Sequence, residues 1–320
     1  MIELGYALSS EEHGPNDLVR YAQRAEEVGF TFALISDHYH PWISAQGESP
    51  FVWSVLGAIA HKTERLRLGT GVTCPIIRIH PAILAQAVAT VAAMMPGRFF
   101  LGVGAGENLN EHILGDRWPP YDIRSEMLEE AVEVMRLLWE GETQSYWGAH
   151  FTVEDAHLFT LPAEPPAIMV AAGGSNSAEA AGRFGDGMIN VGPHAKLVDA
   201  FHATGGEGKP CYGQLTVCWA QAVEEAQQTV YEQWPNSGMT GELTQELRTV
   251  THFEQAAKML SKEQAVKHIV CGPDVQEYLE NLQKFAEAGY GYVYLHQIGP
   301  DQEGFFQFCQ RELFPAFQQK

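Results

Sequence analysis

The chain alternates short apolar runs with longer segments in which apolar residues recur at helical spacing. Residues 2–8 have the pattern of a strand, and the following "DLVRYAQRAEEVG" has the spacing of a helix and ends in glycine. The same unit continues through "FTFALIS", "FVWSVLGAIAHKT", "LRLGTGVT", "PAILAQAVATVAAMMPG" and "RFFLGVGAG". A repeating series of strands and helices predicts a parallel sheet covered by helices.

Four later segments extend this series: "AIMVAAGG", "DGMINVG", "GQLTVCWA" and "GYVYLHQIG". With the earlier ones they make about eight strands, the number that closes a (β/α)8 TIM barrel of the α/β class. The polar and aromatic "TQSYWGAHFTV" predicts a short β excursion. Residues from about 224 to 270 fit the repeat poorly and predict an insertion near the substrate. Because no Gly/Ser linker or internal repeat divides the chain, we expect one domain over residues 1–320.

The charge of the chain limits its partners. The formal net charge of -20 argues against nucleic acid or an anionic membrane as a bulk partner, since both require basic patches. The start "MIELGYALSS" lacks the pattern of a secretion signal, and no uncharged apolar run reaches about 18 residues. The five cysteines are scattered and lack CxxC spacing. We therefore expect a cytoplasmic protein without a disulfide or zinc framework.

The segment "SDHYHPW", residues 36–42, places an aspartate, two histidines and a tryptophan directly after a strand. In a TIM barrel the loops that follow the strands meet at one rim, where the active site lies. Three further unusual loops follow strands in this chain: "GTGVTCP", "GVGAGENLNE" and "AAGGSNS". Together these four loops predict an active site at that rim.

The His38-x-His40 spacing admits a metal site, as in barrel hydrolases. Such a site needs further ligands from other strand ends, for which Asp37 and His296 are candidates. No partner motif accompanies them, so we predict no metal. The alternative is a structural His-Pro turn packed by Trp42, an interpretation that suits His40 better than His38.

Two glycine-rich loops leave alternatives open. In "GVGAGEN", Glu107 stands where a dinucleotide fingerprint requires glycine, so these glycines either only turn the chain or bring backbone close to a flat ligand beside Glu107. In "AAGGSNSAEAAGRFG", the N–H groups at a helix start could hold a phosphate without any cationic side chain. Simple capping by Ser175 or Ser177 would give the same composition.

Taken together, "SDHYHPW", "PIIRIHPAILAQ", "PGRFFLGVGAGENLNE" and "AAGGSNSAEAAGRFGDG" resemble the luciferase-like flavin and deazaflavin oxidoreductases. The similarity is to the branch of F420-dependent glucose-6-phosphate dehydrogenase and F420-dependent alcohol dehydrogenase. It runs to about Gly192 and, more weakly, from Lys258 to the end. It implies a luciferase-like barrel, the deazaflavin coenzyme F420, hydride transfer at its C5, a small-molecule substrate and a homodimer.

The resemblance also implies roles for individual residues. His38 would be the base or orient the substrate, Glu107 would handle charge near ring N1, and Trp42 would form a wall; the roles of His38 and Glu107 could be exchanged. The Gly71-Val72 bond corresponds to a non-proline cis peptide behind the coenzyme ring. The residues expected to contact the coenzyme are Asp37, Gly71, Val72, Asn110, Ala171, Ala172, Gly173, Gly174 and Val191.

The sequence departs from the sugar-phosphate dehydrogenases at the residues that hold the substrate phosphate. Those enzymes use two lysines and an arginine. Here the first position corresponds to His194 with Lys196 close by, the second falls near Thr244 and Gln245, and the third corresponds to Lys267. We therefore expect weak or absent activity on glucose 6-phosphate, which leaves a neutral alcohol, another sugar or a reductase role.

Three alternatives to an F420-dependent oxidoreductase remain at this point. The first is an FMN-dependent monooxygenase on the same barrel. The second is a metal-dependent hydrolase built on His38 and His40. The third is a barrel that binds the coenzyme without turnover, which the titratable residues of the loops make less favourable.

Overall fold

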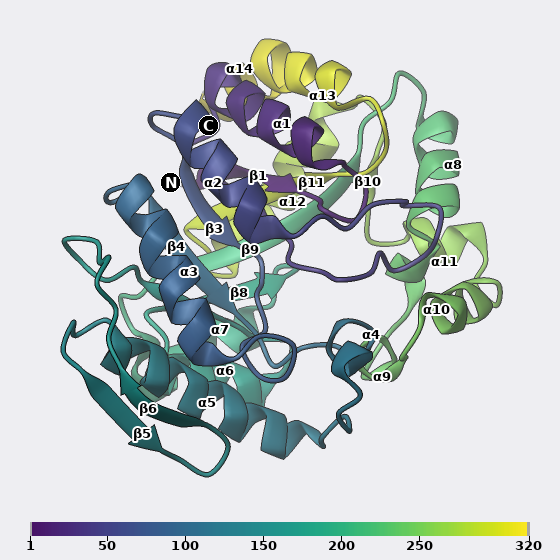
Figure 1. Ribbon diagram of the computed structural model, residues 1–320. Coiled ribbons are helices and arrows are strands. Elements are labelled where there is room, and N and C mark those ends of the chain that lie inside the picture. The colour runs from purple at the N-terminus through teal and green to yellow at the C-terminus, as the bar shows by residue number, and fades with distance from the viewer. Residues whose placement is uncertain (1, 319–320) are drawn as a thin grey trace.

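A computed structural model describes residues 2–318 of the chain. Eight parallel strands form a closed ring in which β1 pairs with β2 and β11, and β8 pairs with β9 (Figure 1). The predicted (β/α)8 TIM barrel is therefore confirmed. The eight strands are β1 (Glu3–Leu8), β2 (Phe32–Ile35), β3 (Arg67–Thr70), β4 (Phe99–Val103), β7 (Ile168–Ala171), β8 (Gly187–Val191), β9 (Cys211–Cys218) and β11 (Tyr292–Gln297).

Helices surround the ring of strands (Figure 1). They are α1 (Pro15–Val28), α2 (Val52–Lys62), α3 (Pro81–Met94), α5 (Tyr121–Leu138), α6 (Ser175–Phe184), α7 (Ala195–Phe201), α12 (Val275–Glu287), α13 (Gln302–Phe308) and α14 (Phe314–Gln318). Helix α1 shows why these segments fold as they do. Leu18, Ala22, Ala25 and Val28 form its buried stripe, and Gly29 ends it with a φ of 114°. Glycine adopts this left-handed conformation without the steric cost of a Cβ atom.

The inside of the barrel is filled by large side chains. Phe32, Phe100, Tyr212 and Tyr294 are buried there, together with aliphatic residues from neighbouring strands. A Cβ atom on Gly69 would lie 2.2 Å from Cε2 of Phe100, so this position in β3 has to be glycine for the ring to fit. The barrel is thus a packed core below its rim, as small eight-stranded barrels require.

Two smaller β elements lie outside the ring. Strands β5 (Gln144–Trp147) and β6 (Thr152–Ala156) form an antiparallel hairpin, which matches the predicted β excursion. The two-residue β10 (Val270–Cys271) pairs with the end of β9 and was not expected from the sequence. A run of two residues is too short to give a strand pattern.

The segment from about 224 to 270, where an insertion is predicted, consists mainly of short helices. They are α8 (Val223–Gln233), α9 (Leu243–Glu246), α10 (Val250–Ala257) and α11 (Lys262–Val266). Figure 1 shows them beside the barrel, with α9 next to α4 (Asn108–Glu111). A hydrogen bond from Asn108 Nδ2 to the Glu246 carbonyl, 3.1 Å long, joins these two helices. Among residues 2–318, no helix is both long enough and apolar enough to span a bilayer.

Candidate active site

A pocket of about 400 Å³ opens at the rim where the barrel strands end. Each of the eight barrel strands contributes a lining residue from the strand itself or from the loop that follows. The lining includes ten of the residues singled out in the sequence: His38, Trp42, Gly71, Val72, Glu107, Ala171, Ala172, Gly173, Val191 and His194. The four loops therefore meet at one site, as their positions after strands predict.

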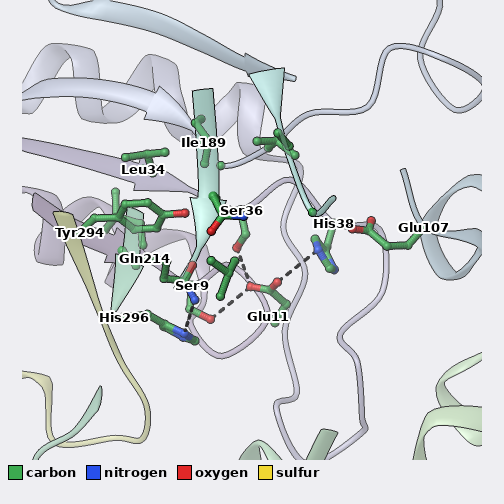
Figure 2. A pocket seen from close by; sticks show the side chains of 18 of the residues that line it. Ser9, Glu11, Leu34, Ser36, His38, Glu107, Ile189, Gln214, Tyr294 and His296 are labelled. Atoms are coloured by element: carbon green, nitrogen blue, oxygen red, sulfur yellow. Dashed lines mark hydrogen bonds and ion pairs between the residues drawn. The ribbon is translucent and has the colours of Figure 1, made fainter. Parts of the chain in front are cut away.

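His38 lies in this pocket and is paired with a carboxylate. Its Nε2 is 3.4 Å from Oε1 of Glu11, and its Nδ1 is 3.3 Å from the carbonyl oxygen of His40. The Trp42 ring packs edge-on against the imidazole, with centroids 4.9 Å apart. In Figure 2 the His38 imidazole lies beside Glu11, and the Glu107 carboxylate points toward it from the other side.

Glu11 is the partner that the sequence reasoning missed. Its carboxylate is buried and accepts hydrogen bonds from the hydroxyls of Ser36 at 2.5 Å and Ser9 at 3.2 Å. Burial by itself would raise the pKa of Glu11, but His38, the Ser36 hydroxyl and a backbone hydrogen bond together hold it below its ordinary value. The signal was available, because "SSEEH" follows the first strand directly.

Helix α4 fixes the loop that carries His38. The Asn110 side-chain oxygen accepts hydrogen bonds from the backbone N–H groups of Tyr39, at 2.9 Å, and His40, at 3.1 Å. Nδ1 of His40 is 3.0 Å from the carbonyl oxygen of Leu109. His38 and His40 therefore have different partners, and His40 has the structural position that the His-Pro turn interpretation gave it. Asn110 is buried outside the pocket lining, so its predicted contact with a coenzyme stays a prediction.

Asp37 does not line the pocket, and its carboxylate is held by hydrogen bonds to neighbouring side chains. It accepts hydrogen bonds from Thr73 Oγ1 at 2.8 Å and from Arg78 Nη2 at 2.9 Å. The backbone N–H of Arg78 donates to Glu111 Oε2 at 2.8 Å, and the side-chain Nε of Arg78 is 3.6 Å from Glu111 Oε1. Burial raises the pKa of Glu111 to about 7 against the opposing pull of Arg78. The predicted contact of Asp37 with a coenzyme stays a prediction.

One side of the pocket can accept a flat ligand. The Gly71-Val72 peptide is cis and lines the pocket beside Ala171, Ala172 and Gly173. A Cβ atom on Gly104 would lie 2.8 Å from Cγ2 of Val72, so glycine there makes room for the Val72 side chain. A Cβ on Gly173 or Gly174 would meet nothing within 4 Å, which leaves this edge of the pocket open.

The start of α6 lies at this open edge. The Ser177 hydroxyl accepts the Gly174 N–H at 3.0 Å, which is the capping that the sequence allowed. The N–H groups of the first helical turn, from Ser175 onward, have no acceptor within a helix. They carry the positive end of the helix dipole, so the capping and anion-binding interpretations are compatible here.

The residues proposed to bind a substrate phosphate are not gathered together. His194 lines the pocket, and so does Gln245 from the segment where an insertion is predicted. Lys196 and Lys267 are exposed and lie outside the lining. Their roles in substrate binding stay predictions.

Sequence reasoning gave little weight to the opposite wall of the pocket. His296, Gln214, Trp234 and Tyr294 line it. Nε2 of His296 is 3.3 Å from Oε2 of Glu12, the residue after Glu11. His296 was considered only as a metal ligand; within residues 2–318, no group of three or more His, Cys, Asp and Glu side chains is arranged to hold a metal ion.

The side of the pocket formed by Gly71, Val72, Ala171, Ala172 and Gly173 is called the glycine-lined bed. A closed (β/α)8 barrel that carries this bed and a His–Glu pair at its C-terminal rim places the protein in the class of TIM-barrel enzymes. A family model described as luciferase-like monooxygenase matches residues 1–291. The chain belongs to this luciferase-like family.

Relatives with assigned enzyme names match nearly the whole chain. The F420-dependent glucose-6-phosphate dehydrogenase of Segniliparus rotundus is 34% identical, and the match covers 98% of this chain and 97% of the relative. The enzyme of the same name from Tsukamurella paurometabola is also 34% identical, with the same coverage of 98% and 97%. A solved F420-dependent secondary alcohol dehydrogenase, in complex with an F420-acetone adduct, is 28% identical with a TM-score of 0.91 over 99% of each chain.

Proposed function

We propose that this protein is an F420-dependent dehydrogenase that exchanges a hydride between a CH–OH substrate, or its carbonyl product, and the deazaflavin coenzyme. The observation that carries the proposal is the pairing of His38 with Glu11 in the same pocket as the glycine-lined bed. The full-length similarity to F420-dependent dehydrogenases supports the choice of coenzyme.

The bed and the start of α6 fit the parts of such a coenzyme. Gly71, Val72, Ala171 and Ala172 would face the flat ring, and Val191 would contact it from β8. Gly173 and Gly174 leave open space toward α6, whose first-turn N–H groups would hold the coenzyme phosphate. Coenzyme F420, when bound, supplies a deazaflavin ring that accepts or donates hydride at C5.

His38 would do the acid–base work. When an alcohol is oxidised, its carbon loses a hydride and its hydroxyl loses a proton, which the His38 imidazole accepts. The Glu11 carboxylate would then stabilise the imidazolium through the contact at 3.4 Å. Glu107 lines the pocket at the start of α4, where it would handle charge near the pyrimidine side of the ring. Trp42 packs against His38 and lines the pocket, so it would form a wall that limits the movement of the substrate beside His38.

A comparison of two coenzymes tests this proposal. Fluorescence quenching measures the affinities of the purified protein for F420 and for FMN, and we expect binding of F420 at least about tenfold tighter, a difference of about 1.4 kcal/mol. Equal affinities, or tighter binding of FMN, would instead favour the monooxygenase activity that the name of the family model describes. Oxygen consumption with reduced FMN would then measure that activity.

The proposal includes a cytoplasmic homodimer. All five cysteines are free and buried, which suits a reducing compartment. The resemblance to the F420-dependent dehydrogenases supports the dimer, and light scattering during gel filtration measures it. We further propose one domain over residues 1–320, with an insertion at about 224–270 that contributes Trp234 and Gln245 to the pocket.

A further inference from the structure

We propose that His296, Gln214 and Trp234 form a subsite that reads hydroxyl groups, so that the substrate is a neutral polyhydroxylated compound such as a polyol or an unphosphorylated sugar. These three residues are called the hydroxyl wall. The inference rests on the proposed function and specifies its substrate class. Figure 2 places His296 and Gln214 on the opposite side of Glu11 from His38.

The surroundings of His296 determine which of its nitrogens carries the proton. Oε2 of the buried Glu12 lies 3.3 Å from Nε2, and a carboxylate accepts, so this nitrogen carries the proton. Glu12 is itself fixed, because its Oε1 accepts the Gly299 N–H at 3.0 Å. Nδ1 of His296 is thereby an acceptor, and it is 3.4 Å from the Gln214 Nε2 donor, so the Glu12–His296 pair fixes the orientation of the Gln214 amide.

Gln214 supplies the acceptor that a ligand can meet. Its Nε2 donates to Thr216 Oγ1 at 3.1 Å and approaches Nδ1 of His296 at 3.4 Å. With the amide nitrogen occupied, the side-chain oxygen of Gln214 is the group that it can present to a ligand. Acceptors of this kind pair with hydroxyl donors, whereas they repel the oxygens of a phosphate.

Trp234 supplies the complementary donor. Its indole Nε1 is buried and has no hydrogen-bond partner among residues 2–318. Its ring packs edge-on against His296, with centroids 4.8 Å apart. A buried N–H without an acceptor costs about 1–3 kcal/mol, so a ligand oxygen that reached this nitrogen would be favoured. The indole also offers an apolar face to the C–H groups of a polyol.

The charge of the pocket agrees with a neutral substrate. Glu11 and Glu107 line it, and none of the lining residues in the described part of the chain is a lysine or arginine. The coenzyme phosphate would meet the start of α6, on the other side. A second phosphate would need charge-assisted donors in the pocket, and Lys196 and Lys267 are exposed outside it.

The test compares substrates that differ in their hydroxyl groups. The ratio of kcat/KM for glycerol or glucose to kcat/KM for 2-propanol is measured with F420 in the wild type, His296→Ala and Gln214→Leu. We expect the wild type to favour the polyhydroxylated substrates and the ratio to fall at least about tenfold in each variant, as loss of one hydrogen bond of about 1.4 kcal/mol implies. His61→Ala, which removes an exposed histidine on α2, is the matched control and should leave the ratio unchanged.

Other outcomes separate this inference from the proposed function. F420 affinity and melting temperature are measured for every variant, and both should change little. If the wild type binds F420 and the ratio does not move, or if F420 affinity falls as much as the ratio, the hydroxyl wall is refuted while the proposed function stands. Efficient oxidation of glucose 6-phosphate that collapses in Lys267→Ala would also refute it. A wild type that does not bind F420 refutes both.

Discussion

Arg78 holds Asp37 at two points: its Nη2 donates to the Asp37 carboxylate at 2.9 Å and to the Asp37 carbonyl at 3.1 Å. The same arginine contacts Glu111 on α4, the helix whose Asn110 binds the next residues of the loop. The residues on either side of His38 are therefore attached to α4, and Glu107 lies at the start of that helix. This arrangement sets the position of His38 relative to Glu107.

Glu111→Gln should change how stability depends on pH. Burial raises the pKa of Glu111 to about 7 from 4.5, so the folded protein binds this proton more tightly than the unfolded chain. The resulting stabilisation is complete below pH 4.5 and is lost as the pH rises through about 7. We expect the free energy of unfolding of the wild type, relative to Glu111→Gln, to fall by up to about 3 kcal/mol between about pH 5 and about pH 8. Urea denaturation at both pH values measures it, and equal pH dependence in the two proteins would contradict the prediction.

His38→Ala and Glu107→Gln should each lower kcat by roughly 100-fold or more, the usual scale of acid–base catalysis. Both side chains line the pocket, so removing either should affect turnover far more than coenzyme affinity. Steady-state kinetics and F420 titration measure the two effects. His40→Ala is the comparison variant, since its imidazole meets the Leu109 carbonyl, and it should matter less. An essential His40 together with a requirement for added metal would support the hydrolase alternative instead.

Glu11→Gln should lower kcat because the imidazolium formed at His38 loses the carboxylate 3.4 Å away. The loss should be smaller than that of His38→Ala, and the double variant should be no slower than His38→Ala alone, because both changes act on one proton acceptor. A double-mutant cycle in kcat measures this coupling. Additive losses would mean that Glu11 acts independently of His38.

Gly174→Asp should weaken F420 binding without destabilising the protein. A Cβ atom at this position meets nothing within 4 Å, and the backbone is extended, so the side chain fits. Aspartate favours a helix start, but its charge would repel the coenzyme phosphate, and we expect about a tenfold loss of affinity. Gly174→Asn is the neutral control and should retain affinity. Equal affinities of the two variants, measured by fluorescence titration, would place the phosphate elsewhere.

Strand and helix periodicity were enough to predict the barrel. The apolar runs that precede "SDHYHPW" and "GVGAGENLNE" became β2 and β4, and the helices between them follow from the spacing of residues such as Leu18 and Ala22. The short helices α8 to α11 were not predicted individually. Elements of four to eight residues, which include three of these four, carry too few turns for a periodic signal.

The chain order also determined that His38, Gly71, Glu107 and Ala171 would meet, because parallel strands end at one rim. Their partners depended on the tertiary structure. Glu11 lies 27 residues from His38 in sequence, and Asn110 lies 71 residues from Tyr39. Local sequence patterns indicate which side chains directly follow a strand. Their hydrogen-bond partners depend on how loops from different strands pack together. The sequence alone therefore determined the barrel and the rim at which its chemistry would lie. Only folding decided that Asp37 turns to Arg78, that His38 pairs with Glu11, and that Lys196 and Lys267 stay outside the pocket, since these outcomes depend on burial and distance between loops.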